Sequence, residues 1–223
     1  MTEMLSVRLR KIIDCIPHAD ILADVGCDHG YIGTFALLEN RVKETVFIDI
    51  SRPSLDKAIQ FATSMGVGER CRFLHRDGLG NCRADVAVIA GMGGMEIISV
   101  LKETEKLPDT LVLQPMKNVC DLRIYLQENY RLQYDKLFKD GKYYNLIVAA
   151  KGSDSLSADE IAFGRTNLDC PDESFVQFIS EQLEKYRQIA LDTDNQQVHD
   201  KVQQLRETLK TVKEKTQCYN QKC

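Results

Sequence analysis

The chain has 223 residues, of which 43% are hydrophobic and 28% charged, and its formal net charge is −4. These values are typical of one folded α/β domain with a small appendage, and they exclude a disordered chain. No apolar run reaches the roughly 18–20 residues that cross a bilayer. The first residues show neither the basic nor the apolar region of a signal peptide. We therefore expect a cytoplasmic protein that is neither secreted nor in the membrane.

The cysteines and histidines argue against a metal site. The chain has eight cysteines and four histidines, but no two cysteines have C-x-x-C spacing and the histidines are scattered. Tetrahedral zinc sites depend on such closely spaced pairs. We predict reduced thiols and no bound metal.

The charge is distributed unevenly. Residues 1–152 carry twenty basic and twenty acidic side chains, residues 153–200 three and eleven, and residues 201–223 six and two. The isoelectric point near 5.6 argues against non-specific binding to nucleic acid. A local basic face near the end of the chain is still compatible with an RNA partner.

The first part of the chain alternates short apolar runs with helical stretches, which predicts βαβ units and a parallel sheet. A helix over residues 5–16 comes first and is expected to cover one end of the sheet. The Asp140-Gly141 pair predicts a hairpin between the last two strands. Parallel strands that end in such a hairpin are typical of a Rossmann-like class I methyltransferase fold. The predicted strands are 21–25, 44–48, 71–74, 85–89, 110–113, 132–138 and 143–149.

After residue 152 the pattern becomes helical. We predict a short helix over 158–168, a second helix that starts after Cys170-Pro171-Asp172, a break at 192–195 and a last helix. The last two should form an antiparallel coiled-coil hairpin. The apolar faces predicted for this hairpin are Phe175, Phe178, Leu183, Tyr186 and Ile189 on the first helix, and Val198, Val202, Leu205, Leu209 and Val212 on the second.

Three basic residues, Arg206, Lys210 and Lys213, follow the same spacing one position along from the apolar seam of the last helix. We call them the basic stripe. The simpler interpretation is a solvated flank of a coiled coil. Because the rest of the appendage is acidic, we instead predict that the basic stripe contacts RNA phosphates.

The segment Asp24–Gly30 ends the first strand and opens a helix. Gly26 lets the backbone approach a ligand, and the helix N-terminus attracts a carboxylate. A dinucleotide site would favour G-x-G-x-x-G, but Asp28 stands where the second glycine would be. An acid followed by G-x-x-x-G is typical of S-adenosylmethionine sites. The alternative is a tight strand–helix turn without a ligand.

Three further strand ends support a nucleoside ligand. Asp49, followed by Ile50, lies about twenty residues beyond the glycine loop, where an acid can bind both hydroxyls of a ribose. Asp77 and Gly78 could read the adenine ring, or form an Asp-Gly turn only. The glycine-rich segment Ile89–Gly94 should border the reactive methyl, and it lacks the Asp/Asn-Pro-Pro-aromatic motif common in methyltransferases of exocyclic amines. The predicted cofactor-binding residues are Asp24, Gly26, Cys27, Gly30, Asp49, Ile50, Asp77, Gly78, Ala90, Gly91, Met92 and Gly93.

Together these motifs resemble the bacterial tRNA methyltransferases that modify N1 of adenine 22. The combination of D-x-G-x-D-H with I-A-G-M-G-G is the specific part of the resemblance. Cys27, Met116 and Asn145 depart from residues common in the family, and the last two are expected near the substrate. The segments that carry the resemblance are Leu5–Leu9, Asp24–Tyr31, Asp77–Leu79, Ile89–Gly94, Leu113–Pro115, Leu122–Leu126 and Gly141–Tyr144.

The resemblance implies S-adenosyl-L-methionine as cofactor and tRNA as substrate. Adenine N1 already carries a lone pair, but it lies on the Watson–Crick edge, so the base must be unpaired before attack. Because the product is cationic, a nearby carboxylate would stabilise it, and we predict Asp28 and His29 as catalytic residues. His29 could instead only orient Asp28. Tyr31 should shape the base pocket, and Arg8 should hold a phosphate, unless it makes only a salt bridge from its helix.

We therefore predict a methyltransferase domain over residues 1–152 and a tRNA-gripping helical domain over 153–223, in a monomer. A small-molecule methyltransferase is one alternative. The other is an inactive RNA-binding scaffold on the same fold.

Overall fold

The computed structural model describes residues 5–220, with only the backbone for 217–220. Cys223 therefore lies outside the described residues, as does the side chain of Cys218, so the free thiols predicted for both are not described. The strands are β1 (Ala19–Val25), β2 (Val42–Asp49), β3 (Cys71–His75), β4 (Val86–Met92), β5 (Thr110–Pro115), β6 (Tyr130–Asp140) and β7 (Lys142–Lys151). The helices are α1 (Val7–Asp14), α2 (Tyr31–Leu38), α3 (Arg52–Ser64), the 3-10 helix η2 (Gly68–Arg70), α4 (Gly94–Lys102), α5 (Val119–Leu126), α6 (Ala158–Phe163), α7 (Arg165–Asp169), α8 (Glu173–Leu191) and α9 (Gln196–Asn220).

In the described part of the chain the strands form one sheet of seven, in the order β3-β2-β1-β4-β5-β7-β6. Strands β1 to β5 are parallel, and β7 runs antiparallel to both β5 and β6. The turn between β6 and β7 pairs Asp140 with Lys142 around Gly141, whose φ is +69°. The predicted Rossmann-like fold with its terminal hairpin is confirmed. The chain order reverses between β1 and β4, where ligands bind in open α/β sheets.

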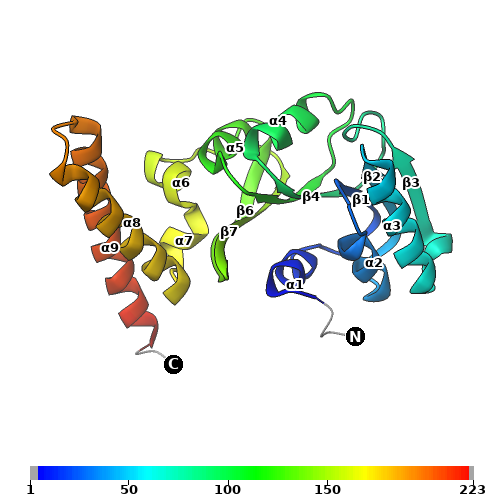
Figure 1. The fold of residues 1–223 in the computed structure, drawn as a ribbon, viewed down its shortest axis with the longest axis horizontal. Helices are drawn as coiled ribbons and strands as arrows, with labels where there is room; N and C mark the ends of the chain where they lie inside the picture. The colour runs from blue at the N-terminus through cyan, green and yellow to red at the C-terminus, as the bar shows by residue number, and fades with distance from the viewer. Residues whose placement is uncertain (1–4, 221–223) are drawn as a thin grey trace.

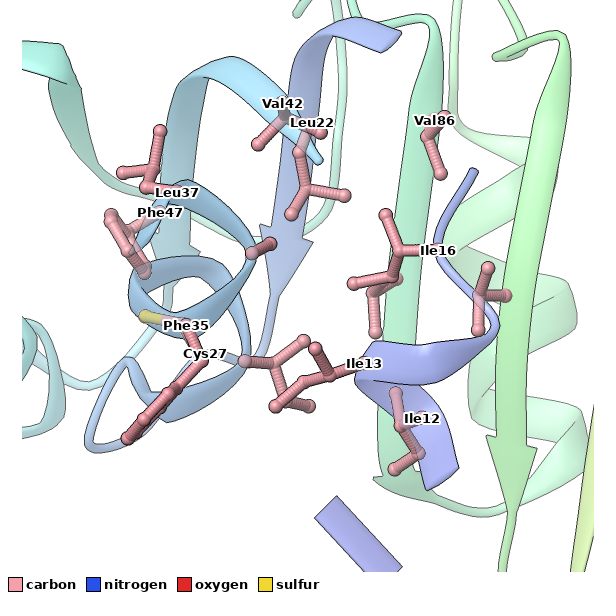
Figure 2. Packing of buried hydrophobic residues seen from close by; sticks show 14 of the residues in the cluster. Ile12, Ile13, Ile16, Leu22, Cys27, Phe35, Leu37, Val42, Phe47 and Val86 are labelled. Carbon is pink, nitrogen blue, oxygen red and sulfur yellow. The ribbon is translucent and has the colours of Figure 1, made fainter. Parts of the chain in front are cut away.

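Two apolar clusters fill the two faces of the sheet. Helices α1, α2 and α3 cover one face, and α4 and α5 cover the other. Figure 2 shows how α1 is anchored: Ile12 and Ile13 of α1, and Ile16 just after it, belong to the first cluster, and Ile13 lies on the side of Phe35 of α2. All three isoleucines are at most 1% exposed. The predicted cover over the sheet is present, although the helix is shorter than residues 5–16.

A third cluster joins the helical appendage to the sheet. Leu137 of β6 packs with Phe175 and Ile179 of α8 and with Leu205 and Val212 of α9. The hairpin α8–α9 lies at the opposite end of the molecule from α2 and α3, as Figure 1 shows. The predicted helical hairpin is therefore present.

The apolar faces predicted for the hairpin are only partly right. Ile179 was not predicted and is fully buried, whereas Ile189 is 40% exposed. In α9, Leu205 and Val212 are buried, but Val198 is only half-buried and lies outside the cluster.

One helix prediction is wrong. Residues 158–168 do not form a single helix, because α6 and α7 are separated at Gly164, whose φ is +85°. A Cβ at this position would lie 2.9 Å from the Arg123 guanidinium and from the Asp135 carboxylate. The glycine therefore allows the chain to turn against a buried ion pair.

The turn at Gly164 brings α7 against β6, the edge strand of the sheet. The backbone N–H of Asp135 donates to Thr166 Oγ1, and that of Leu137 donates to Asn167 Oδ1, each at 2.9 Å. Side chains of α7 thus satisfy donors that an edge strand would otherwise leave unpaired. Although α7 follows residue 152, it contacts the sheet directly.

Candidate active site

The glycine loop between β1 and α2 is held in a conformation that favours glycine. Gly26 has φ +69°, and its N–H donates to Ile48 O at 2.8 Å. A Cβ on Gly26 would overlap with the Met92 methyl group. Gly30 has φ +71°, and a Cβ there would lie 2.8 Å from Ala58 Cβ. These glycines allow close contact, Gly26 with the end of β4 and Gly30 with α3.

Two carboxylates, Asp24 and Asp49, accept hydrogen bonds from backbone N–H groups in and around this loop. Asp24 is 3% exposed, and its Oδ2 accepts a hydrogen bond from Gly33 N at 2.9 Å. Burial raises the pKa of Asp24 to about 7, and the negative charge of Asp49 acts in the same direction. Asp49 Oδ2 accepts from Asp28 N at 3.0 Å, and its Oδ1 accepts from Ser51 N at 2.8 Å. Asp49 therefore ties the glycine loop to the start of α3.

Two cavities open at the carboxyl ends of the parallel strands and share Gly26 and Met92. The first, which we call the Asp49 cavity, has a volume of about 280 Å³. The second, the Arg8 cavity, has a volume of about 510 Å³. The predicted residues Gly26, Asp49, Ile50, Asp77, Gly78 and Met92 line the Asp49 cavity, and Arg8, Asp24, Gly26, Cys27, Asp28, His29, Tyr31, Ala90, Gly91 and Met92 line the Arg8 cavity.

Some predicted residues lie outside both cavities. Gly30 is buried at the start of α2, and Gly93 is buried before α4, where a Cβ would overlap with the Glu96 carboxylate. The basic stripe lies on α9, on the separate helical hairpin, and its three side chains are exposed. Sequence reasoning also missed wall residues. They are Val25, Ile48, Arg76, Glu96, Ser99, Val100 and Glu103 in the Asp49 cavity, and Leu9 and Ile32 in the Arg8 cavity.

Asp28 and His29 form one side of the Arg8 cavity. Asp28 has an unusual φ of +39°, and its carboxylate lies 3.5 Å from both His29 Nε2 and Lys57 Nζ. Its side chain is 58% exposed, so it is free to meet a ligand from solvent. His29 stacks on Tyr31 with ring centroids 5.4 Å apart, and Tyr31 packs edge-on against Phe61. This arrangement gives the cavity one charged and one aromatic wall.

Cys27 is buried between these groups. Burial and the neighbouring carboxylates raise the pKa of its thiol, so the thiol is protonated at neutral pH. This protonation argues against a nucleophilic role.

Arg8 also lines the Arg8 cavity. Its Nη1 donates to Gln114 Oε1 at 2.8 Å, and its backbone N–H donates to Asp140 Oδ2 at 3.0 Å. The guanidinium carbon lies 5.6 Å from the centre of the Tyr144 ring. Helix α1 thus brings a cation to the cavity through contacts with β5, β6 and β7.

The two departures expected near the substrate lie apart from each other. Met116 is 50% exposed at the end of β5, where its sulfur accepts from Gln114 Nε2 at 3.3 Å. Asn145 instead contacts Arg123 at 3.4 Å and lines neither of the two cavities.

Among the described residues there is no group of three or more His, Cys, Asp or Glu side chains that could hold a metal ion. Likewise, no helix within 5–220 is long and apolar enough to span a membrane.

A family model of the TrmK family, described as tRNA (adenine(22)-N(1))-methyltransferase, matches residues 22–214. The chain belongs to this family. The protein of that name from Bacillus subtilis (strain 168) is 28% identical over 233 residues, which cover 96% of this chain and 98% of the relative. The family resemblance predicted from the sequence is confirmed.

Solved structures agree with this assignment. Sp1610 of Streptococcus pneumoniae, in complex with S-adenosyl-L-methionine, has 28% identity and a TM-score of 0.84, covering 92% of this chain and all (100%) of that one. Mycoplasma capricolum TrmK, in complex with S-adenosyl-homocysteine, has 23% identity and a TM-score of 0.85, covering 94% and 99%. The second likeness supports the fold, including the helical appendage.

Proposed function

We propose that the chain transfers a methyl group from S-adenosylmethionine to N1 of adenine 22 in tRNA, the reaction for which its family is named. The observation that carries the proposal is the pair of cavities that meet at Gly26 and Met92. The Asp49 cavity suits a nucleoside. The Arg8 cavity is large enough for the methionine part of the cofactor together with a base. A bound methyl donor must extend into both.

The Asp49 cavity fits the adenosine half of the cofactor. The Asp49 carboxylate lies at the end of β2, where it can accept hydrogen bonds from both ribose hydroxyls. Ile50 is 68% exposed, and an adenine ring would cover this apolar side chain. Asp77 and the backbone of Gly78 line the same cavity and can bind the polar edge of that ring.

The Arg8 cavity fits the other half of the cofactor and the target base. A ligand ammonium beside Asp24 would favour the ionised form of this buried acid. When bound, S-adenosylmethionine supplies an electrophilic methyl group on a sulfonium. The protein needs mainly to align the base with that methyl, because adenine N1 is already a nucleophile. Tyr31 and His29 provide a ring surface for a base, and Asp28 can balance the positive charge that develops on it.

The helical hairpin is suited to holding the rest of the tRNA. The basic stripe is exposed along α9, where lysine and arginine can replace counterions on RNA phosphates. We propose that residues 153–223 serve mainly this purpose and that residues 1–152 hold the cofactor site. We further propose that the protein acts as a monomer in the cytoplasm, where its substrate is found.

Methylation of unmodified tRNA transcripts tests the proposal. Product nucleosides are mapped by mass spectrometry, with a transcript carrying guanosine at position 22 as the matched control. We expect 1-methyladenosine at position 22 only and no product from the control. Methylation of a small molecule but not of tRNA would favour the first alternative, and cofactor binding without any transfer would favour an inactive scaffold.

A further inference from the structure

The guanidinium of Arg8 is held at the mouth of the Arg8 cavity. A Cβ placed on Gly91 would lie 3.8 Å from Arg8 Nη1, so the cation borders the glycine-rich end of β4. Gln114 engages one of its five N–H donors. Within residues 5–216, whose side chains are described, no carboxylate forms an ion pair with this guanidinium. Asp140 accepts only from the backbone N–H of Arg8.

The positive charge of Arg8 is unfavourable beside the sulfonium and the target base. Both a sulfonium and an N1-methylated adenine are cations, and a guanidinium beside them would repel them. A guanidinium matches a phosphate in charge and in donor geometry. Given the proposed function, the group that fits Arg8 is a phosphate next to the target nucleotide.

Gln114 cannot contact such a substrate itself. It is fully buried (0% exposed) and does not line the cavity. Its Nε2 donates to Pro115 O at 3.2 Å and to Met116 Sδ at 3.3 Å. These two contacts orient the amide so that Oε1 faces Arg8 across the sheet end.

We propose that Gln114 is a positioning residue that holds the Arg8 guanidinium ready to bind a tRNA phosphate. Arginine carries several rotatable bonds, and a side chain restrained before binding loses less freedom when the phosphate arrives. The contact of Arg8 N with Asp140 fixes the helix end, and the contact with Gln114 fixes the side chain. Gln114 therefore acts on substrate affinity through Arg8.

A double-mutant cycle tests this role in the full chain. Arg8→Ala should raise the KM for the tRNA transcript about tenfold with little change in kcat, because a remote phosphate contact binds ground and transition states alike. Gln114→Met keeps the length of the side chain but removes the acceptor, and should raise KM by several-fold. In the double variant KM should be no higher than in Arg8→Ala alone.

Two further measurements separate positioning from a general structural effect. Arg10 lies on the same helix, but its guanidinium is paired with Asp14 and Glu39, so Arg10→Gln should leave the KM for tRNA unchanged. Calorimetry should show unchanged S-adenosylmethionine affinity in Gln114→Met. Effects of Arg8→Ala and Gln114→Met that multiply, or a loss of cofactor affinity in Gln114→Met, would overturn the proposal. If the wild type does not methylate adenine 22, the proposed function fails, and the same cycle measured by direct tRNA binding still tests Gln114.

Discussion

The buried ion pair between α5 and β6 allows a quantitative prediction. Arg123 Nε and Nη2 donate to the two carboxylate oxygens of Asp135 at 2.7 and 2.9 Å, and the two side chains are 2% and 1% exposed. Arg123 Nη1 also donates to Ile161 O at 2.9 Å. Replacing Arg123 by methionine leaves a carboxylate and a carbonyl without their donor. Removing one partner of a buried pair typically costs about 3–5 kcal/mol, a large part of the 5–15 kcal/mol that stabilises most domains.

The double variant Arg123→Met/Asp135→Leu separates the charge from the packing. It removes the uncompensated carboxylate and leaves mainly the Ile161 carbonyl unpaired, which costs about 1–3 kcal/mol. We therefore expect the double variant to be more stable than Arg123→Met by roughly 2 kcal/mol. Urea unfolding followed by circular dichroism measures both differences. The reasoning is refuted if Arg123→Met loses less than about 1 kcal/mol, or if the double variant is the less stable of the two.

Four predictions concern the site and the RNA surface. Asp49→Ala should weaken S-adenosylmethionine binding by about 1–3 kcal/mol through loss of the ribose hydrogen bonds, and unchanged affinity by calorimetry would reject that role. Asp28→Ala and His29→Ala should retain cofactor affinity but reduce turnover at least about tenfold; wild-type rates of tRNA methylation would mean that they only shape the loop. The affinity for tRNA falls as salt rises, and alanine at all three positions of the basic stripe should make the slope of log affinity against log salt shallower by about three. An unchanged slope would mean that the stripe does not contact the tRNA. The pKa of Asp24 is raised to about 7 in the folded protein. Between about pH 4 and 7 the folded protein therefore keeps a proton on Asp24 that the unfolded chain has lost. The free energy of unfolding should fall as pH rises through that window. Urea titrations of Asp24→Asn should show a flatter profile, and the same slope in both proteins would contradict the raised pKa.

The sequence predicted best those elements whose signals are local. Each parallel strand is an apolar run bounded by polar or glycine residues, so the positions of the strands along the chain and their parallel or antiparallel type were confirmed even where the ends differ, as at Val42 of β2. The loops predicted to bind the cofactor also lie directly after their strands. For this reason Gly26, Asp49 and Asp77 could all be assigned to one edge of the sheet before any coordinates were known.

What the sequence did not predict depends on contacts between distant residues. The apolar spacing of residues 158–168 fits a single helix, and only the position of the Arg123–Asp135 pair explains why the chain turns at Gly164. The roles of Gln114 and Asp140 were missed for a similar reason. They contact Arg8 across 106 and 132 positions of the chain, and no local pattern encodes such a pairing.

The two halves of the candidate site therefore depend on different parts of the fold. The Asp49 cavity, which we propose holds the adenosine half of the cofactor, is lined by residues between Val25 and Glu103, from consecutive βα units. The Arg8 cavity, which we propose receives the target base, also requires α1, an eight-residue helix too short to be stable alone in water. The isoleucines of α1 bind it to the sheet, but Gln114 and Asp140, from the last strands, decide where Arg8 points. A change in β5 or in the β6–β7 turn should therefore alter tRNA affinity while leaving cofactor affinity intact.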